Sequence, residues 1–126
     1  MAIPASAKVM TFICTFDRER SKAFYGGRLG FELTHEDDSA VVFDLNGTML
    51  RVSEAPAFTP ADHTVLGWEV SDIVATVKAM RAKGMSFNTY EGFGQDDLGI
   101  WTAPGGTTRV AWFEDPDGNV LSLTQF

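Results

Sequence analysis

The sequence predicts an α+β fold of two tandem βαβββ modules in a single domain, and three observations support this prediction. The chain has 126 residues, 44% of them apolar and 21% charged, which fits one compact domain. A strand-like run followed by an Asp-capped helix occurs twice, with Asp17 and Asp72 separated by 55 positions. Each half also ends in a tight turn between strand-like runs, at Gly47 and at Gly118.

The first module is predicted over about residues 8–54. Its first strand is the β-branched and aromatic run KVMTFICTF at 8–16, and Asp17 then caps a helix that Gly30 ends. The pair Asn46-Gly47 is a strong signal for a two-residue hairpin. Three further strands are predicted, FELTHE at 31–36, AVVFDL at 40–45 and TMLRVS at 48–53.

The second module is predicted over about residues 64–126 and begins in the same way, after a linker at 55–63. The run TVLGWEV is its first strand, and Asp72 caps a helix that ends at Gly84. The two hairpin glycines are 71 positions apart, whereas the two helix caps are 55 apart. The second module therefore carries 16 extra residues, and these must lie between its helix and its hairpin.

The extra residues fall in the stretch EGFGQDDLGIWTAPGGTT, at 91–108, which contains five glycines, one proline and two aromatic residues. Long loops in compact domains are usually functional or mobile, so this stretch is a candidate lid. An irregular connection between strands explains the same composition equally well.

Charge and composition restrict the class of partner. The formal net charge is −7 and no run of Lys and Arg is present, which argues against nucleic acid and against an anionic membrane surface. The single cysteine, Cys14, excludes an intrachain disulfide. We find neither a signal peptide pattern nor a run of about 18 apolar residues, and we expect a soluble, cytoplasmic protein.

Three segments resemble the vicinal oxygen chelate superfamily, which includes glyoxalase I, extradiol dioxygenases, and bleomycin- and fosfomycin-resistance proteins. They are SKAFYGGRLGFEL, KGMSF after the second capped helix, and the terminal FEDPDGNVLSL. The resemblance spans nearly the whole chain. It implies that the modules form a curved, half-barrel mixed sheet with helices on the outer face and the site on the concave face, within one chain or across a homodimer.

The resemblance also implies where a divalent metal would bind in catalytic members, namely on the first and last strands of the modules. Counting from the helix caps and the hairpin glycines places these positions at Met10, Arg51, Val65 and Ser122. Histidine and carboxylate oxygens are the usual ligands of zinc, manganese and iron in such sites, and these four residue types do not replace them. We therefore expect no metal and no cofactor.

Strand alternation then predicts the residues that line the concave face. Phe12 and Cys14 share the face of Met10, and a two-residue turn between Asp115 and Gly118 would add Phe113 and Arg109 to the face of Ser122. By the same parity, Trp68 and Trp112 would pack under the helices. The candidate ligand-binding residues are Phe12, Cys14, Arg51, Glu69, Phe93, Trp101, Arg109, Phe113 and Ser122.

Two of these candidates have simpler structural roles open to them. Arg51 can grip a ligand carboxylate, but it can also form an ion pair with Asp44, which the Asn-Gly hairpin places nearby. Cys14 has no histidine on a neighbouring strand to activate it, so a buried core position suits it better than a nucleophilic role. No catalytic residue is assigned.

The leading hypothesis is a metal-free protein that binds a small organic molecule, aromatic or anionic, without changing it chemically. The alternative is a lyase, isomerase or dioxygenase that recruits a metal through His63 and Glu69 or works by metal-free acid-base chemistry. A third interpretation is a structural or regulatory partner domain. The resemblance also favours a homodimer.

Overall fold

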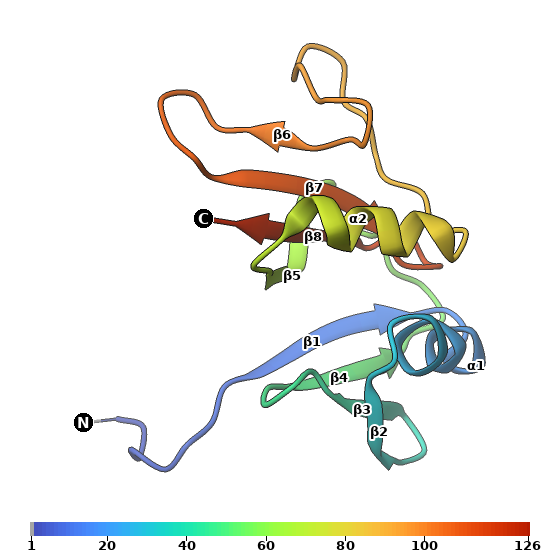
Figure 1. The fold of residues 1–126 in the computed structure, drawn as a ribbon. Coiled ribbons are helices and arrows are strands. Elements are labelled where there is room, and N and C mark those ends of the chain that lie inside the picture. The colour runs from blue at the N-terminus through green and yellow to red at the C-terminus, as the bar shows by residue number, and fades with distance from the viewer. Residues whose placement is uncertain (1) are drawn as a thin grey trace. The chain divides into compact units, whose positions relative to one another are not determined.

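The computed structural model describes residues 2–126, and the chain divides into two compact units, one ending at Thr59 and the other running from Pro60 to Phe126. Each unit is a four-stranded mixed sheet with one helical segment, as Figure 1 shows. The predicted α+β class and the repeated βαβββ order are confirmed. No helix among the described residues is long and apolar enough to cross a membrane.

The first unit has the strand order β1-β4-β3-β2, with β1 parallel to β4 and the other neighbours antiparallel. Its strands are β1 (Met10–Thr15), β2 (Glu32–Glu36), β3 (Ala40–Asp44) and β4 (Met49–Glu54). The predicted two-residue turn at Asn46-Gly47 is confirmed, since Leu45 N donates to Thr48 O at 2.8 Å.

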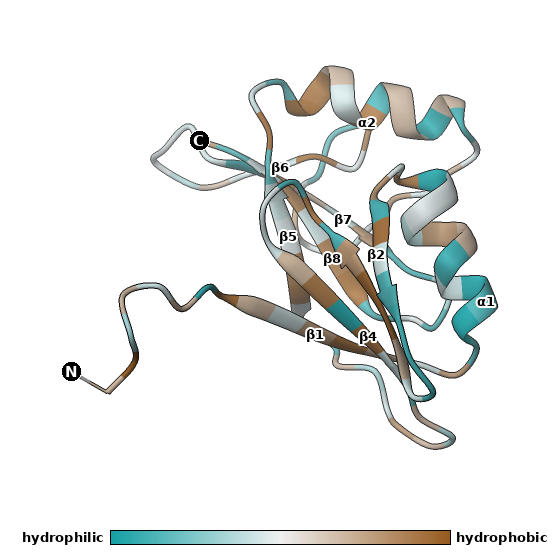
Figure 2. Ribbon diagram, turned by 90° about the horizontal axis from the view of Figure 1, so that it is seen from below, coloured by the Kyte–Doolittle hydropathy of each residue, from teal (hydrophilic) through white to brown (hydrophobic). Residues whose placement is uncertain are grey.

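The helical segment of this unit begins at the predicted cap, because the Asp17 side chain accepts hydrogen bonds from the backbone N–H groups of residues 19 and 20. It consists of α1 (Arg18–Ser21) and a π-helical continuation, η1 (Lys22–Arg28). Figure 2 shows hydrophilic colour along much of α1. The buried residues of η1 face the sheet, where the ring of Tyr25 lies 5.7 Å from that of Phe43.

The second unit repeats this order as β5-β8-β7-β6, again with its first and last strands parallel. Asp72 caps α2 as predicted, accepting from Ala75 N at 3.0 Å. Gln125 Oε1 accepts from Ile73 N at 2.8 Å, so α2 covers the sheet face to which Gln125 belongs. The elements are β5 (Thr64–Glu69), α2 (Ile73–Ala82), β6 (Trp101–Thr102), β7 (Arg109–Glu114) and β8 (Val120–Gln125).

The two units also share the register of their parallel strand pairs. Phe12 pairs with Arg51 in the first unit, and Gly67 pairs with Ser122 in the second. A β-bulge at Val65 shifts the register between its two neighbours. Because of this bulge, both Thr64 and Gly67 lie on the face of Ser122.

The second hairpin differs from the prediction. Asp115 N donates to Asn119 O at 3.0 Å, so the loop holds three residues rather than two, and Gly118 adopts φ = 88° at its last position. Trp112 therefore pairs with Ser122. A shift of one residue moves every side chain of a strand to the other face.

Three face assignments on β7 change with this register. Arg109 and Phe113 lie on the helix face, and Trp112 lies on the face of Ser122, so the three predictions made from the two-residue turn are wrong. Phe113 is only 1% exposed and belongs to the core under α2. The prediction for Trp68 is confirmed, since it pairs with Leu123 on the helix face and its ring lies 6.3 Å from that of Phe113.

Candidate functional site

The second unit contains a pocket of about 370 Å³ on the sheet face opposite α2. Trp112 and Val120 contribute to it from β7 and β8, and Thr64, which pairs with Val120, contributes from the start of β5. The remaining walls come from the segment that precedes β5 and from the extra loop. The lining residues are Asp62, His63, Thr64, Tyr90, Phe93, Trp112 and Val120.

Three of the lining residues are aromatic, and together with the neighbouring Trp101 they form the aromatic cluster, defined as Tyr90, Phe93, Trp101 and Trp112. Trp112 is its centre, with ring centroids 5.4 Å from Tyr90, 5.8 Å from Phe93 and 5.9 Å from Trp101. Tyr90 and Phe93 stand nearly perpendicular to Trp112, at 79° and 80°. Such edge-to-face contacts are favourable for aromatic pairs and keep the rings in fixed orientations.

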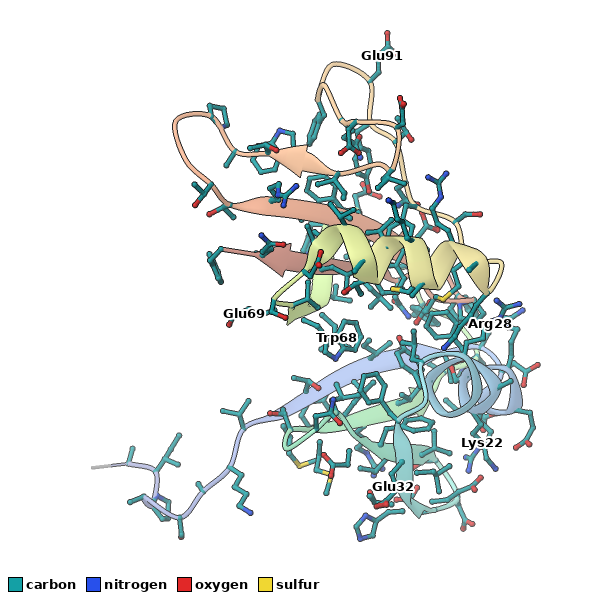
Figure 3. All side chains as sticks on the ribbon, viewed as in Figure 1. Lys22, Arg28, Glu32, Trp68, Glu69 and Glu91 are labelled. Carbon is teal, nitrogen blue, oxygen red and sulfur yellow. The ribbon has the colours of Figure 1, made fainter. Side chains whose placement is uncertain are left out.

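Hydrogen bonds from one side chain hold the extra loop in place. Gln95 Oε1 accepts from Tyr90 N at 2.7 Å, while Gln95 Nε2 donates to Asn88 O at 2.9 Å and to Gly99 O at 2.7 Å. The loop also contains the short strand β6, whose Trp101 pairs with Val110 on the pocket face. Glu91, in the same loop, projects away from the rest of the unit (Figure 3).

Asn88 orients the phenol of Tyr90. Its Nδ2 donates to Tyr90 Oη at 3.1 Å and to Glu114 Oε2 at 3.0 Å. Since Glu114 pairs with Val120, its carboxylate belongs to the pocket face of the sheet. Asn88 thereby links the phenol of Tyr90, which lines the pocket, to the carboxylate of Glu114.

Several predicted site residues lie on this face of the second sheet. Phe93 lines the pocket and is 48% exposed. The ring centroid of Trp101 lies 6.4 Å from that of Phe93. Ser122 and Glu69 share the face but do not line the pocket. Arg109 and Phe113 lie on the opposite face, under α2.

The predicted candidates of the first unit are Phe12, Cys14 and Arg51, which share one sheet face. Arg51 Nη1 donates to Asp37 Oδ2 at 3.1 Å, and its Nη2 donates to Ser39 Oγ at 3.2 Å. Asp44, the alternative partner of Arg51, instead accepts from Gly47 N at 2.6 Å, so the ion pair of Arg51 forms with Asp37 and not with Asp44.

The carboxylate that Arg51 contacts is strongly stabilised in its charged form. The backbone N–H of Ser39 is the main cause, and Arg51 adds to it, so that the pKa of Asp37 falls to about 2. The guanidinium of Arg51 thus stabilises the hairpin between β2 and β3.

The four positions at which the resemblance implies metal ligands do not fit a metal. Met10, Val65, Arg51 and Ser122 together offer a thioether, a cation, a hydroxyl and no carboxylate or imidazole, a poor set for a hard divalent ion. No group of three or more His, Cys, Asp or Glu residues that could hold a metal occurs within residues 2–126. A Cβ added to Gly67 would lie 2.6 Å from Ser122 Oγ, so the serine side chain packs directly over the glycine.

Sequence reasoning missed Tyr90, Trp112, Thr64 and Asp62 as pocket residues. The signal available in the sequence for Tyr90 was its position directly before the extra loop, three residues before Phe93. The assumed turn length puts Trp112 on the wrong face, and Thr64 reaches the pocket face through the bulge at Val65. His63, a metal ligand under the enzyme alternative, lies in the pocket wall.

The family comparison agrees with the fold and the repeated module. The model of the Glyoxalase/Bleomycin resistance protein/Dioxygenase superfamily matches residues 8–123. The chain belongs to this superfamily. A comparison with curated protein sequences gives no match.

Several solved structures superpose over nearly the whole chain. TnmS3, an antibiotic binding protein from Streptomyces sp. CB03234, is 26% identical, with a TM-score of 0.72 over 99% of this chain and 98% of its own. The fosfomycin resistance protein FosX from Listeria monocytogenes is 13% identical, with a TM-score of 0.75 over 98% and 95%. A glyoxalase/bleomycin resistance protein/dioxygenase from Alicyclobacillus acidocaldarius is 17% identical, with a TM-score of 0.71 over 100% and 95%.

Proposed function

We propose that this superfamily member binds a small organic molecule with an aromatic or apolar body in the pocket of its second module and leaves it chemically unchanged. One observation carries the proposal, the gathering of three aromatic rings around a pocket of about 370 Å³. Small-molecule pockets commonly measure about 300–1,000 Å³ and are lined by apolar and aromatic side chains with a few polar groups. The lining residues of this pocket have that composition.

The arrangement of the rings favours a flat ligand. Phe93 is 48% exposed, so its ring can gain contacts that the protein alone does not supply. Each aromatic contact of suitable geometry contributes about 0.5–1.5 kcal/mol beyond the burial of area. Thr64 and the Tyr90 hydroxyl are placed to fix the orientation of such a ligand by hydrogen bonds.

The donor set supports binding without conversion. The side chains at the four positions where the resemblance implies metal ligands do not fit a metal. The likeness to TnmS3, which is described as an antibiotic binding protein, agrees with a ligand of this kind.

The test is a titration with 2-naphthol, a neutral flat aromatic compound, monitored by the indole N–H signals of ¹⁵N-labelled protein. We expect the signals of Trp101 and Trp112 to shift in a saturable way and that of Trp68, on the helix face, to stay unchanged. Phe93→Leu should weaken binding severalfold. The matched control is Phe126→Leu, because Phe126 is equally an exposed phenylalanine but lies outside the pocket.

Two results would contradict the proposal. If no indole signal of the cluster responds to 2-naphthol or to a panel of larger aromatic compounds, the pocket is not a ligand site. If a bound compound is recovered from the protein in altered form, by chromatography and mass spectrometry, the enzyme alternative replaces the binding function.

A further inference from the structure

We infer that the ligand of this pocket is an organic cation, a protonated or quaternary amine carried on an aromatic or apolar body. The inference rests on the proposed function and specifies the class of ligand. It is argued from the distribution of charge over the second unit and from the geometry of its rings.

The second unit carries most of the negative charge of the protein. Residues 60–126 contain nine Asp and Glu but four Lys and Arg, a net charge of −5 out of −7 for the chain. Such an excess creates a negative potential that attracts cations and repels anions.

All four basic residues of the second unit belong to the side of the sheet that carries α2. Lys78 and Arg81 are on α2 itself, and Lys83 is its C-cap. Arg109 pairs with Gln125, whose side chain bonds the first residue of α2. None of the described residues that line the pocket is a lysine or an arginine.

The acidic residues are distributed differently, because three of them belong to the pocket face. Asp62 lines the pocket. Glu114 pairs with Val120, which also lines it, and Glu69 pairs with Thr124 on the same face of β8. The four basic residues thus belong to the helix side of the sheet, whereas these three carboxylates belong to the pocket side.

The aromatic rings complement this charge. The face of an aromatic ring carries a partial negative charge, and tryptophan binds cations most strongly. Tyr90 and Phe93 stand at 79° and 80° to Trp112, so rings of different orientation border one pocket. Aromatic walls of this kind together with a carboxylate are suited to an ammonium group, which needs little directional hydrogen bonding.

Asp62 alone would attract a cation weakly, because it is exposed to water and exposed charge pairs contribute little. The rings strengthen this attraction, because they exclude water from one side of the bound ammonium. Asn88 holds a second carboxylate, that of Glu114, and the hydroxyl of Tyr90 in fixed positions. Carboxylate and rings are therefore expected to act together.

The test compares three probes of similar shape, 2-phenylethylammonium, 2-phenylethanol and phenylacetate, by the indole N–H titration of the intact chain. We expect the ammonium to bind about 5- to 10-fold more tightly than the alcohol, and phenylacetate to bind most weakly. Asp62→Asn should reduce the preference for the ammonium without affecting the alcohol. Asp97→Asn is the matched control, an acidic residue of the same unit that lies outside the pocket.

The outcomes separate this inference from the proposed function. If the alcohol binds as tightly as the ammonium, or phenylacetate binds best, the inference is overturned while the binding function stands. If none of the three probes, nor 2-naphthol, shifts the signals of Trp101 and Trp112, both fail. If Asp62→Asn and Asp97→Asn have the same effect, the preference comes from overall charge and the role of Asp62 is overturned.

Discussion

The two modules share strand order and, beyond the bulge at Val65, the register of their parallel strand pairs, but they differ in the segment that connects the helix to the second strand. In the first module, a short connection leads into β2, and the β2–β3 hairpin is held by charged side chains. Arg18 contacts Glu36 at 3.2 Å and Glu54 at 3.1 Å. In the second module, the extra loop brings aromatic residues onto the sheet, and Gln95 holds this loop. The same frame therefore supports a charged hairpin in one copy and an aromatic pocket in the other.

This difference shows where a duplicated fold can vary without loss of the frame. The strands and helix caps recur because each module needs them to bury its own core. Most residues of the connection after the helix are not buried, although Ile100 is, so this segment tolerates insertion and can acquire binding residues. Four experiments test this difference between the modules.

The largest effect is expected from two aromatic substitutions, one in each module. Tyr25→Ala removes a fully buried ring that packs on Phe24 and Phe43, and it should reduce the free energy of unfolding by about 3–5 kcal/mol. Trp112→Ala removes a half-buried ring and should cost only about 1–2 kcal/mol. It should nevertheless abolish the indole shifts of Trp101 with 2-naphthol. Urea unfolding measures the two losses of stability, and the NMR titration measures the response of Trp101. Equal losses of stability in the two variants would contradict the expected difference between the modules.

A smaller effect is expected at the matched strand pairs of the two modules. Gly67→Ala places a Cβ 2.6 Å from Ser122 Oγ, and overpacking of this kind costs about 1–3 kcal/mol. Ser122→Ala in the same chain removes the clashing oxygen and should restore part of the loss. The equivalent pair of the first module, Phe12 with Arg51, accepts large side chains. A purely additive double-mutant cycle would show that the contact does not limit this position.

A pH-dependent effect is expected in the first module. The pKa of Asp37 is lowered from 3.8 to about 2, so its charged form stabilises the fold above pH 3.8 and this contribution is lost as the pH falls towards 2. Asp37→Asn should therefore flatten the fall in melting temperature over this range. Arg51→Leu should raise the pKa of Asp37 only in part, because the N–H of Ser39 is the larger cause. NMR titration of the Asp37 carboxyl checks both, and a midpoint at its ordinary value would contradict them.

The smallest effect is expected from divalent metals. Incubation with zinc, nickel, manganese or ferrous iron, followed by desalting, should leave no stoichiometric metal on the protein, and EDTA should not change the melting temperature. The reason is the donor set at Met10, Val65, Arg51 and Ser122. Near-unit occupancy by one metal that Glu69→Ala or His63→Ala removes would establish the enzyme alternative.

Local sequence signals were enough to predict the repeated order of strands and helix in the two modules. Asp17 and Asp72 cap their helices because a carboxylate satisfies backbone N–H groups wherever a helix begins, and Asn46-Gly47 forms its turn because few residue pairs accept that backbone geometry. These are local interactions, and local sequence specifies them. The difference of 16 residues between the modules also follows from the sequence alone. It identifies the segment that contains Phe93 and Trp101.

Which residues share the pocket depends on contacts between segments that are distant in the sequence. Asp115 to Asn119 is compatible with a loop of two or three residues, and one residue of register moves Trp112 from one face of the sheet to the other. The bulge at Val65 has the same effect on Thr64. Arg51 binds Asp37 rather than Asp44 for a related reason, since the position of a hairpin end depends on its packing. The sheet face on which a side chain lies depends on how whole strands pair, and this pairing depends on the core that the strands bury.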